Sequence, residues 1–216
     1  MNWFLLILQG ACKTLAMMAG AGLISLVFGC VIGVVSSEYG VKALRFMLEL
    51  LTLLLRGIPY YVQLLVCYFV LPDITGWNWS AEVAAIVSLG LCSMAYTSQI
   101  IKGALNAFPK AQWRAAVALG YSDFAIARFI LLPQVLRSSL RALFMEIEQL
   151  TKSTSVVGAI GVLEITRVGQ NIISRQLNPL PVFACIAACY LALSFCLNQI
   201  MRFLERRLQI DLYTKS

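Results

Sequence analysis

The chain has 216 residues, of which 60% are hydrophobic and only 12% are charged, and its formal net charge is +7. With a mean hydropathy of +0.82, this composition lies far from that of a soluble domain, because a chain of this length has too little polar surface to cover so much apolar area. The sequence contains no histidine. Histidine acid–base catalysis, histidine-containing triads and most zinc sites are therefore excluded. The composition predicts an integral membrane protein.

The cysteines and the basic residues point to no metal, catalytic or nucleic-acid site. All seven cysteines lie in apolar stretches, and none forms a Cys-x-x-Cys pair. Cys185 and Cys189 have a helical spacing that fits a metal pair, but small apolar packing residues fit this context better. The basic residues flank apolar runs instead of clustering, which favours membrane orientation over nucleic-acid binding. No cleavable signal peptide is expected, because residues 1–9 lack a basic start and no clean cleavage site follows.

Five apolar segments are each near the ~20 residues that cross a bilayer. The predicted spans cover residues 13–35, 57–72, 83–104, 138–161 and 182–201. The first is rich in Gly, Ala and Ser, which permit close helix packing, and residues 1–10 before it are expected to lie along the membrane interface.

Two of these segments are expected to be broken. Pro59 predicts a break near residues 56–59, because proline removes a helical hydrogen bond and clashes with the preceding turn. Residues 41–55 then form an amphipathic helix at the cytoplasmic edge, and residues 57–72 form the span. A second break is expected around residues 152–154, within the fourth span.

The distribution of charge predicts the orientation. Basic residues gather in the loops after the first and third spans and in the tail, whereas residues 72–82 have none and carry Trp77 and Trp79, as an outer interfacial belt does. The amino terminus is therefore predicted outside and the carboxyl terminus in the cytoplasm, although residues 152–181 fit this pattern less well. The basic residues on the predicted inner side are Lys42, Arg45, Lys110, Arg114, Arg128, Arg202, Arg206, Arg207 and Lys215.

Small, flexible and helix-breaking residues recur at fixed spacing between the third and fourth predicted spans. They are Arg114-Ala115-Ala116, then Gly120, then Ile130-Leu131-Leu132-Pro133. Residues 111–119 are strong helix formers, Pro109 can open a helix and Gly120 can close it. We therefore predict a short cytoplasmic helix between two spans. Its helical character alone is equally compatible with an ordinary connector.

This spacing resembles the cytoplasmic loop of ABC importer permeases, which reads Glu-Ala-Ala, three residues, Gly, nine residues, Ile-x-Leu-Pro. Six of the seven defining positions are filled, and Arg114 replaces the glutamate. Further segments resemble the polar amino acid uptake branch, which imports histidine, arginine, lysine, glutamine or glutamate. Besides Arg114, this chain departs from the branch at Arg141, where proline is frequent, and more mildly at Ser153, where aspartate is frequent. The similar segments are residues 56–59 with Gln63, 95–97, 109–112, 132–137, 152–155 and 169–170.

The resemblance implies an all-α integral membrane fold, with residues 1–216 forming one transmembrane domain. It implies five transmembrane helices of the type I importer core and a cytoplasmic coupling loop over residues 106–123. In that family the matching helix docks in a groove on the ATPase subunit. The residues expected to couple to it are Arg114, Ala115, Ala116, Gly120, Ile130, Leu132 and Pro133.

The partners also follow from the resemblance. No Gly-x4-Gly-Lys-[Ser/Thr] sequence is present, so ATP and magnesium are expected on a separate ATPase chain, and this chain is expected to bind no cofactor. The implied partners are ATP-binding cassette ATPases, a second permease that is either a copy or a paralogue, and an external amino-acid-binding protein, all at a bacterial inner membrane. Arg114 either contacts a groove whose own charge has changed, which we favour, or is tolerated because a different permease supplies the glutamate.

Ionisable residues inside a span usually face a cavity or a partner, which singles out Glu146 and Glu148. On a helix they point roughly 200° apart, so they cannot share one small site. Glu146 is the favoured substrate ligand, because the branch often has a polar or acidic residue there. A pairing of Glu146 with Arg141 or Lys152 is the alternative. A carboxylate facing the substrate favours arginine, lysine, ornithine or histidine.

The predicted break after residue 152 supplies two further candidates, Ser153 and Thr154, because a broken helix exposes backbone groups that can hold charged ligands. Gln63 and Thr97 are weaker candidates that fit helix–helix hydrogen bonds equally well. Two rival functions remain at this point. A channel or scaffold needs no coupling motif, and a membrane enzyme lacks histidine and clustered carboxylates. Co-purification of an ATP-hydrolysing subunit distinguishes all three.

Overall fold

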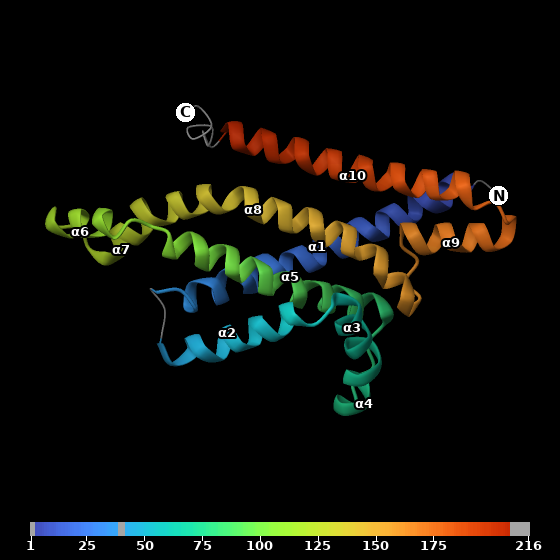
Figure 1. Cartoon of the computed structure of the whole chain (residues 1–216), viewed down its shortest axis with the longest axis horizontal. Helices are drawn as coiled ribbons and strands as arrows, with labels where there is room; N and C mark the ends of the chain where they lie inside the picture. Colours follow the sequence, from blue (N-terminus) through green and yellow to red (C-terminus); the bar gives the residue numbers. More distant parts are fainter. Residues whose placement is uncertain (1–2, 39–41, 208–216) are drawn as a thin grey trace.

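The computed structural model describes residues 3–38 and 42–207, and this part of the chain is built of helices without any strand. The predicted features at residues 1–2, Val41 and Lys215 lie outside the described residues. In chain order the elements are α1 (Trp3–Val35), α2 (Lys42–Gly57), α3 (Tyr60–Leu65), η1 (Val66–Val70), α4 (Leu71–Thr75), α5 (Ala81–Asn106), α6 (Lys110–Ala118), α7 (Asp123–Ile126), η2 (Ala127–Leu131), α8 (Leu132–Ser153), η3 (Thr154–Ile160), α9 (Ile165–Gln176) and α10 (Pro179–Arg207). The long helices α1, α5, α8 and α10 run along the longest axis of the molecule (Figure 1).

Three of the described helices are long and apolar enough to cross a membrane, over Phe4–Val35, Ala81–Asn106 and Pro179–Arg207. Two bent pairs pass the same test together. Leu44–Gly57 and Tyr60–Thr75 meet at 102°, and Asp123–Ile160 and Ile165–Gln176 meet at 48°. The total is five if each bent pair is one span, so the five-span count stays a prediction.

The amino-terminal segment differs from the prediction. Instead of a separate interfacial lead followed by a span, α1 is one helix of 33 residues, or ~50 Å at the helical rise. No proline interrupts residues 3–35, and the helix continues through Gly10, which lies against the backbone of Glu164 and Ile165.

The second apolar run is broken at the predicted place but is oriented differently. Pro59 stands immediately before α3, and α2 ends at Gly57. It is α2 that lies alongside α5, while the segment from α3 to α4 leaves at a steep angle (Figure 1). The charge of Glu49 had favoured the membrane edge, yet its carboxylate is paired with Lys102 of α5 at 2.7 Å. The packing thus sets α2, and not residues 57–72, parallel to the long helices.

Small residues allow α1 and α5 to pack closely. A Cβ added at Gly29 would lie 2.7 Å from Cβ of Thr97, and one at Gly33 would lie 2.8 Å from Cβ of Ile101. Between these helices the Ser25 hydroxyl is 2.8 Å from that of Thr97. The close packing expected of the first span is therefore made against α5.

A buried carboxylate fixes the corner where α9 begins. Glu164 is fully buried, and its side chain accepts hydrogen bonds from the backbone N–H groups of Thr166 at 2.7 Å and Arg167 at 2.6 Å. The Tyr190 hydroxyl of α10 donates to it at 3.2 Å. These bonds satisfy the free donors of the helix start and tie α9 to α10.

Two π-helical segments each end two residues before a proline. They are η1, which precedes Pro72, and η2, which precedes Pro133. A proline within a helix lacks an N–H and clashes with the carbonyl four residues earlier, and a widened turn is a common way to absorb such a defect.

Candidate functional site

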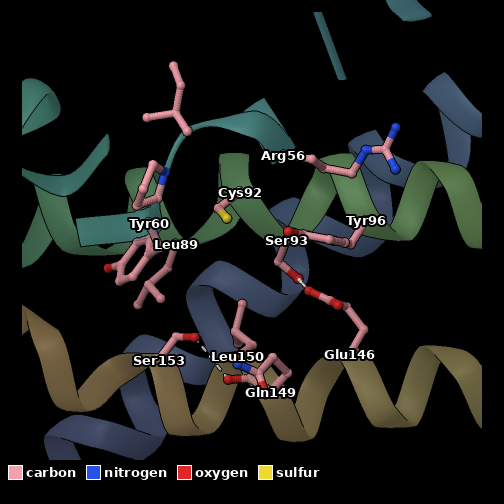
Figure 2. Close-up of a pocket in the computed structure, with 12 residues that line it drawn as sticks. Arg56, Tyr60, Leu89, Cys92, Ser93, Tyr96, Glu146, Gln149, Leu150 and Ser153 are labelled. Carbon is pink, nitrogen blue, oxygen red and sulfur yellow. Dashed lines mark hydrogen bonds between the residues drawn. The ribbon is translucent and has the colours of Figure 1, made fainter. Parts of the chain in front are cut away.

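A cavity of about 360 Å³ lies where the α2–α3 corner faces α5 and α8. Its apolar floor includes Leu89 and Leu150. Its walls carry polar side chains from all three sides of the site (Figure 2). The polar lining residues that matter most are Arg56, Ser93, Tyr96, Glu146, Gln149 and Ser153.

Glu146 reaches the cavity from α8, as the sequence predicts. The Ser93 hydroxyl donates a hydrogen bond of 2.7 Å to its carboxylate. The alternative ion pairs are wrong for the described structure, because Arg141 pairs with Glu205 at 3.0 Å and Lys152 pairs with Glu148 at 2.8 Å. Among the described residues no basic side chain forms an ion pair with Glu146.

Arg56 lies on the opposite side of the cavity, at the end of α2. In Figure 2 the α5 side chains Ser93 and Tyr96 stand between Arg56 and Glu146. Arg56 donates one N–H to the carbonyl of Thr52 at 3.3 Å. The cavity therefore presents a guanidinium on one wall and a carboxylate on the other.

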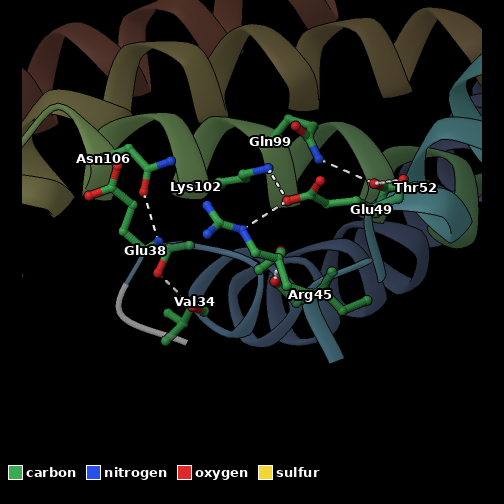
Figure 3. A network of polar contacts seen from close by, with 11 residues as sticks. Val34, Glu38, Arg45, Glu49, Thr52, Gln99, Lys102 and Asn106 are labelled. Atoms are coloured by element: carbon green, nitrogen blue, oxygen red, sulfur yellow. Dashed lines mark hydrogen bonds and ion pairs between the residues drawn. The ribbon is translucent and has the colours of Figure 1, made fainter. Parts of the chain in front are cut away.

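A polar network holds α2, and with it Arg56, against α5 (Figure 3). Glu49 accepts hydrogen bonds from Arg45 at 3.1 Å and from Lys102 at 2.7 Å. One turn further along α2, the Gln99 amide donates to the Thr52 hydroxyl at 3.2 Å. Thr52 thus accepts from Gln99 at its hydroxyl and from Arg56 at its carbonyl, which links Arg56 to the network.

The predicted break after residue 152 is present, since α8 ends at Ser153 and a 3₁₀ segment follows. Ser153 lines the cavity. Thr154 is buried instead, and its hydroxyl donates to the carbonyl of Thr151 at 2.7 Å. The break therefore delivers one of its two candidate residues to the site.

The weaker candidates Gln63 and Thr97 serve helix packing. Gln63 donates its amide N–H groups to the carbonyls of Leu55 at 2.6 Å and Ile58 at 2.7 Å, which braces the α2–α3 corner behind the cavity. Thr97 is buried against Ser25. Neither residue lines the cavity.

Sequence reasoning missed Arg56, Ser93, Tyr96 and Gln149 as site residues. Arg56 carried a usable signal, since it is a charged residue beside a proline break in an apolar run. Ser93 carried none, because small hydroxyls recur along α5, and Tyr96 stood only in the segment 95–97 that resembles the polar amino acid branch.

The predicted short helix is present as α6, which Pro109 precedes. Gly120 has a φ of +83°, a left-handed conformation that glycine adopts without strain. With α7, α6 lies at one end of the molecule (Figure 1). The helix and its glycine stop are thus where the motif spacing predicts them.

The motif residues divide into an exposed and an anchoring set. Arg114, Ala115 and Gly120 are exposed, and Arg114 lines a surface depression of about 450 Å³ with Glu38, Lys110 and Trp113. Ala116 is buried, and Ile130 packs partly buried in a cluster with Trp113. Leu132 and Pro133 begin α8. The segment joins an accessible surface to the long helix α8.

The depression beside Arg114 also involves the loop after α1. Lys110 forms an ion pair with Glu38 at 2.6 Å, and this hydrogen-bonded ammonium group holds the pKa of the Glu38 carboxyl below its usual value. Glu38 therefore stays ionised, and the surface presents charges of both signs around Arg114.

A polar cavity between long apolar helices, with a rigid helix standing out at one end, defines a membrane transport subunit. Residues 25–210 match the family model described as binding-protein-dependent transport system inner membrane component. The chain belongs to this family. It is accordingly a transport component of a membrane and not an enzyme.

Relatives and a solved structure agree with this assignment. The chain is 32% identical over 206 residues to the arginine transport system permease protein ArtQ of Bacillus subtilis (strain 168), covering 94% of this chain and 92% of that protein. It is 36% identical over 157 residues to the glutamine transport system permease protein GlnP of Escherichia coli (strain K12), covering 72% of each. A crystal structure of an amino acid ABC transporter with histidines superposes with a TM-score of 0.87 at 28% identity, covering 95% of both chains. The all-α type I importer fold is thereby confirmed.

Proposed function

We propose that the chain is the permease subunit of an ATP-driven amino acid importer and that the cavity between α2, α5 and α8 binds the amino acid in transit. The observation that carries this proposal is the placement of Arg56 and Glu146 on opposite walls of one cavity. A free amino acid carries both a carboxylate and an ammonium group, so the cavity offers a partner of opposite charge to each. The relatives named for arginine and glutamine transport support this substrate class.

The geometry of the cavity suits a small zwitterion. The guanidinium of Arg56 binds carboxylates through paired N–H groups, and Glu146 accepts hydrogen bonds from an ammonium group. Ligand pockets commonly measure about 300–1,000 Å³, and 360 Å³ is at the small end of that range. Ser93, Tyr96 and Gln149 add neutral groups for a polar side chain.

Glu146 further favours a basic amino acid, and its neutralisation is the test. With Glu146→Gln, uptake of arginine or lysine by the reconstituted importer should fall about tenfold or more, because a hydrogen bond to a charged group contributes about 1.5–3 kcal/mol. Radiolabelled uptake into proteoliposomes measures it. The matched control is Glu148→Gln, which removes the same charge two residues away, where Glu148 pairs with Lys152. Unchanged uptake of basic amino acids in Glu146→Gln would refute the assignment.

We infer that α6 docks on a groove of the ATPase subunit and that Arg114 contacts an altered charge there. Arg114→Glu should then lower substrate-stimulated ATP hydrolysis about fivefold or more, because like charges would meet at the contact. Arg175→Glu, on α9 far from α6 (Figure 1), is the control with the same change of charge. Equal or improved stimulation with Arg114→Glu would contradict a matched charge reversal.

The remaining partners and the orientation follow from the same function. The importer would contain two permeases, either two copies or this chain with a paralogue, two ATPases that bind ATP and magnesium, and an external amino-acid-binding protein. The basic end of α10 lies at the same end of the molecule as α6 (Figure 1), which supports a cytoplasmic carboxyl terminus and an external amino terminus. A channel or scaffold would have no use for the exposed motif helix.

A further inference from the structure

A second hollow, separate from the transport cavity, lies between α8 and α10. It measures about 140 Å³, and its lining combines four apolar residues with the polar side chains of Arg141, Glu148 and Asn198. Phe144 and Met145 of α8 face Leu197 and Met201 of α10 across it. The two helices run antiparallel along the long axis of the molecule (Figure 1).

One end of the groove is closed by Arg141, the residue at which this chain departs from the polar amino acid branch. Its Nε donates to the Glu205 carboxylate of α10 at 3.0 Å. The Arg141 side chain is 64% exposed, whereas that of Glu205 is 11% exposed. A guanidinium carries five N–H donors, and this bond uses one of them. The proposed function leaves this feature without a role.

More arginines surround the same end. Arg137 lies one turn before Arg141 on the same face of α8. On α10, Arg202 lies one turn before Glu205, whereas Arg206 is turned away from the face that carries Leu197, Met201 and Glu205. All four arginines are exposed, and a single carboxylate, Glu205, accompanies them. Arg207 is directed elsewhere, since its guanidinium stacks over the Phe203 ring at 5.3 Å. The end of the groove is therefore strongly basic.

We propose that this groove binds an anionic phospholipid. The phosphate of the headgroup lies at Arg137, Arg141 and Arg202, and an acyl chain lies against the apolar side chains of the groove. Basic pockets between spanning helices at the cytoplasmic surface are suited to anionic headgroups, which attract each Lys or Arg by about 1 kcal/mol. The groove supplies both halves of such a site, a cationic end and the apolar side chains of Phe144, Met145, Leu197 and Met201.

A second copy of this chain fits the groove less well. In a two-fold symmetric contact the same surface meets itself, so the arginines of one copy would face those of the other at close range. The membrane, in contrast, supplies a ligand with the complementary charge and an apolar tail. The partly bare apolar surface of α10, with Leu191 70% and Phe195 64% exposed, leaves the groove open to lipid.

Native mass spectrometry of the full chain in neutral detergent tests the proposal with two lipids of equal acyl chains. Dioleoylphosphatidylglycerol should bind saturably and about tenfold or more tightly than dioleoylphosphatidylcholine. The double variant Arg137→Gln/Arg141→Gln should lose about tenfold or more of the phosphatidylglycerol affinity. The control pair Arg167→Gln/Arg175→Gln, on α9 at the opposite end of the helices, removes the same charge and should keep it.

Further measurements distinguish the contribution of the headgroup from that of the acyl chain. Met145→Trp fills the groove without changing the charge and should weaken phosphatidylglycerol binding several-fold, while soluble glycerol phosphate should not displace the lipid. Equal binding of the two lipids, or an equal loss in the control pair, would overturn the proposal. So would displacement by glycerol phosphate, which would indicate a simple anion site. A change in permease self-association with unchanged lipid binding would assign the groove to a subunit contact instead.

Discussion

Gly33→Val should lower the unfolding free energy of the chain by about 3 kcal/mol, at the upper end of the range for overpacking. The reason is the contact between α1 and α5. A Cβ at residue 33 would lie 2.8 Å from the Ser98 carbonyl oxygen as well as 2.8 Å from Cβ of Ile101, and a backbone carbonyl within a helix cannot rotate away. For a chain of this size the loss corresponds to a Tm decrease on the order of 10 °C. Thermal unfolding of the detergent-solubilised protein measures it.

Gly22→Val is the matched control. It lies on the same helix, undergoes the same substitution and has no heavy atom within 4 Å of the added Cβ. Its change in helix propensity is the same as that at residue 33. A Tm decrease of equal size in both variants would show that the effect comes from the helix itself and not from its contact with α5.

The sequence predicts close packing in α1 but not its partner. Gly29 and Gly33 are one turn apart in an apolar run, which is typical of a tight interface. Nothing in that run identifies α5, because Thr97 and Ile101 lie more than sixty residues away and resemble many other residues of the chain. The stretch that becomes a helix is a local property, whereas the choice of neighbour depends on the shapes of both surfaces.

Glu164→Ala should destabilise the chain by about 2–4 kcal/mol, because three donors lose their acceptor inside the protein. Two are the N–H groups that open α9, and the third is the Tyr190 hydroxyl. Glu164→Gln should be intermediate, since one of its oxygens can still accept. Thermal unfolding in detergent checks the order of the three proteins.

The control for this substitution is Glu148→Ala. It removes a carboxylate whose recorded partner is Lys152, one turn away on the same helix, and such exposed pairs typically contribute less than about 1 kcal/mol. If Glu164→Ala unfolds at the temperature of the unsubstituted chain, the carboxylate does not hold the α9 corner.

The acidic residues show how much of the site could be predicted from the sequence. Glu146 could be predicted as a cavity residue, because a carboxylate in an apolar helix is costly unless it faces a cavity or a partner. Glu164 was not singled out, since it lies between the predicted spans 138–161 and 182–201, yet it is the more deeply buried of the two. Arg56 was visible only as part of a break. Its position opposite Glu146 depends on the packing of α2 against α5.

The turn of 102° after α2 separates the two parts of the second apolar run. Residues 57–72 were the more apolar choice, while α2 carried Arg45 and Glu49. A charged residue can be satisfied by water or by another helix, and the composition of a segment does not distinguish them. The charge of Glu49 is satisfied by Lys102 of α5, which lies 53 residues later in the chain.

The widened turn η2 determines in which direction around the helix axis the side chains of α8 point. A π-helical turn contains one residue more than an α-helical turn needs, and each residue turns the helix by about 100°. The π-helical turn Ala127–Leu131 absorbs one extra residue, so every residue of α8 is offset by up to about 100° from its place on an uninterrupted α-helix. Glu146 points at Ser93 with this offset. The extra residue thus changes how the cavity-facing side of α8 is rotated relative to the end of the molecule that carries α6. An otherwise identical α8 without it would present a different face to the transport site.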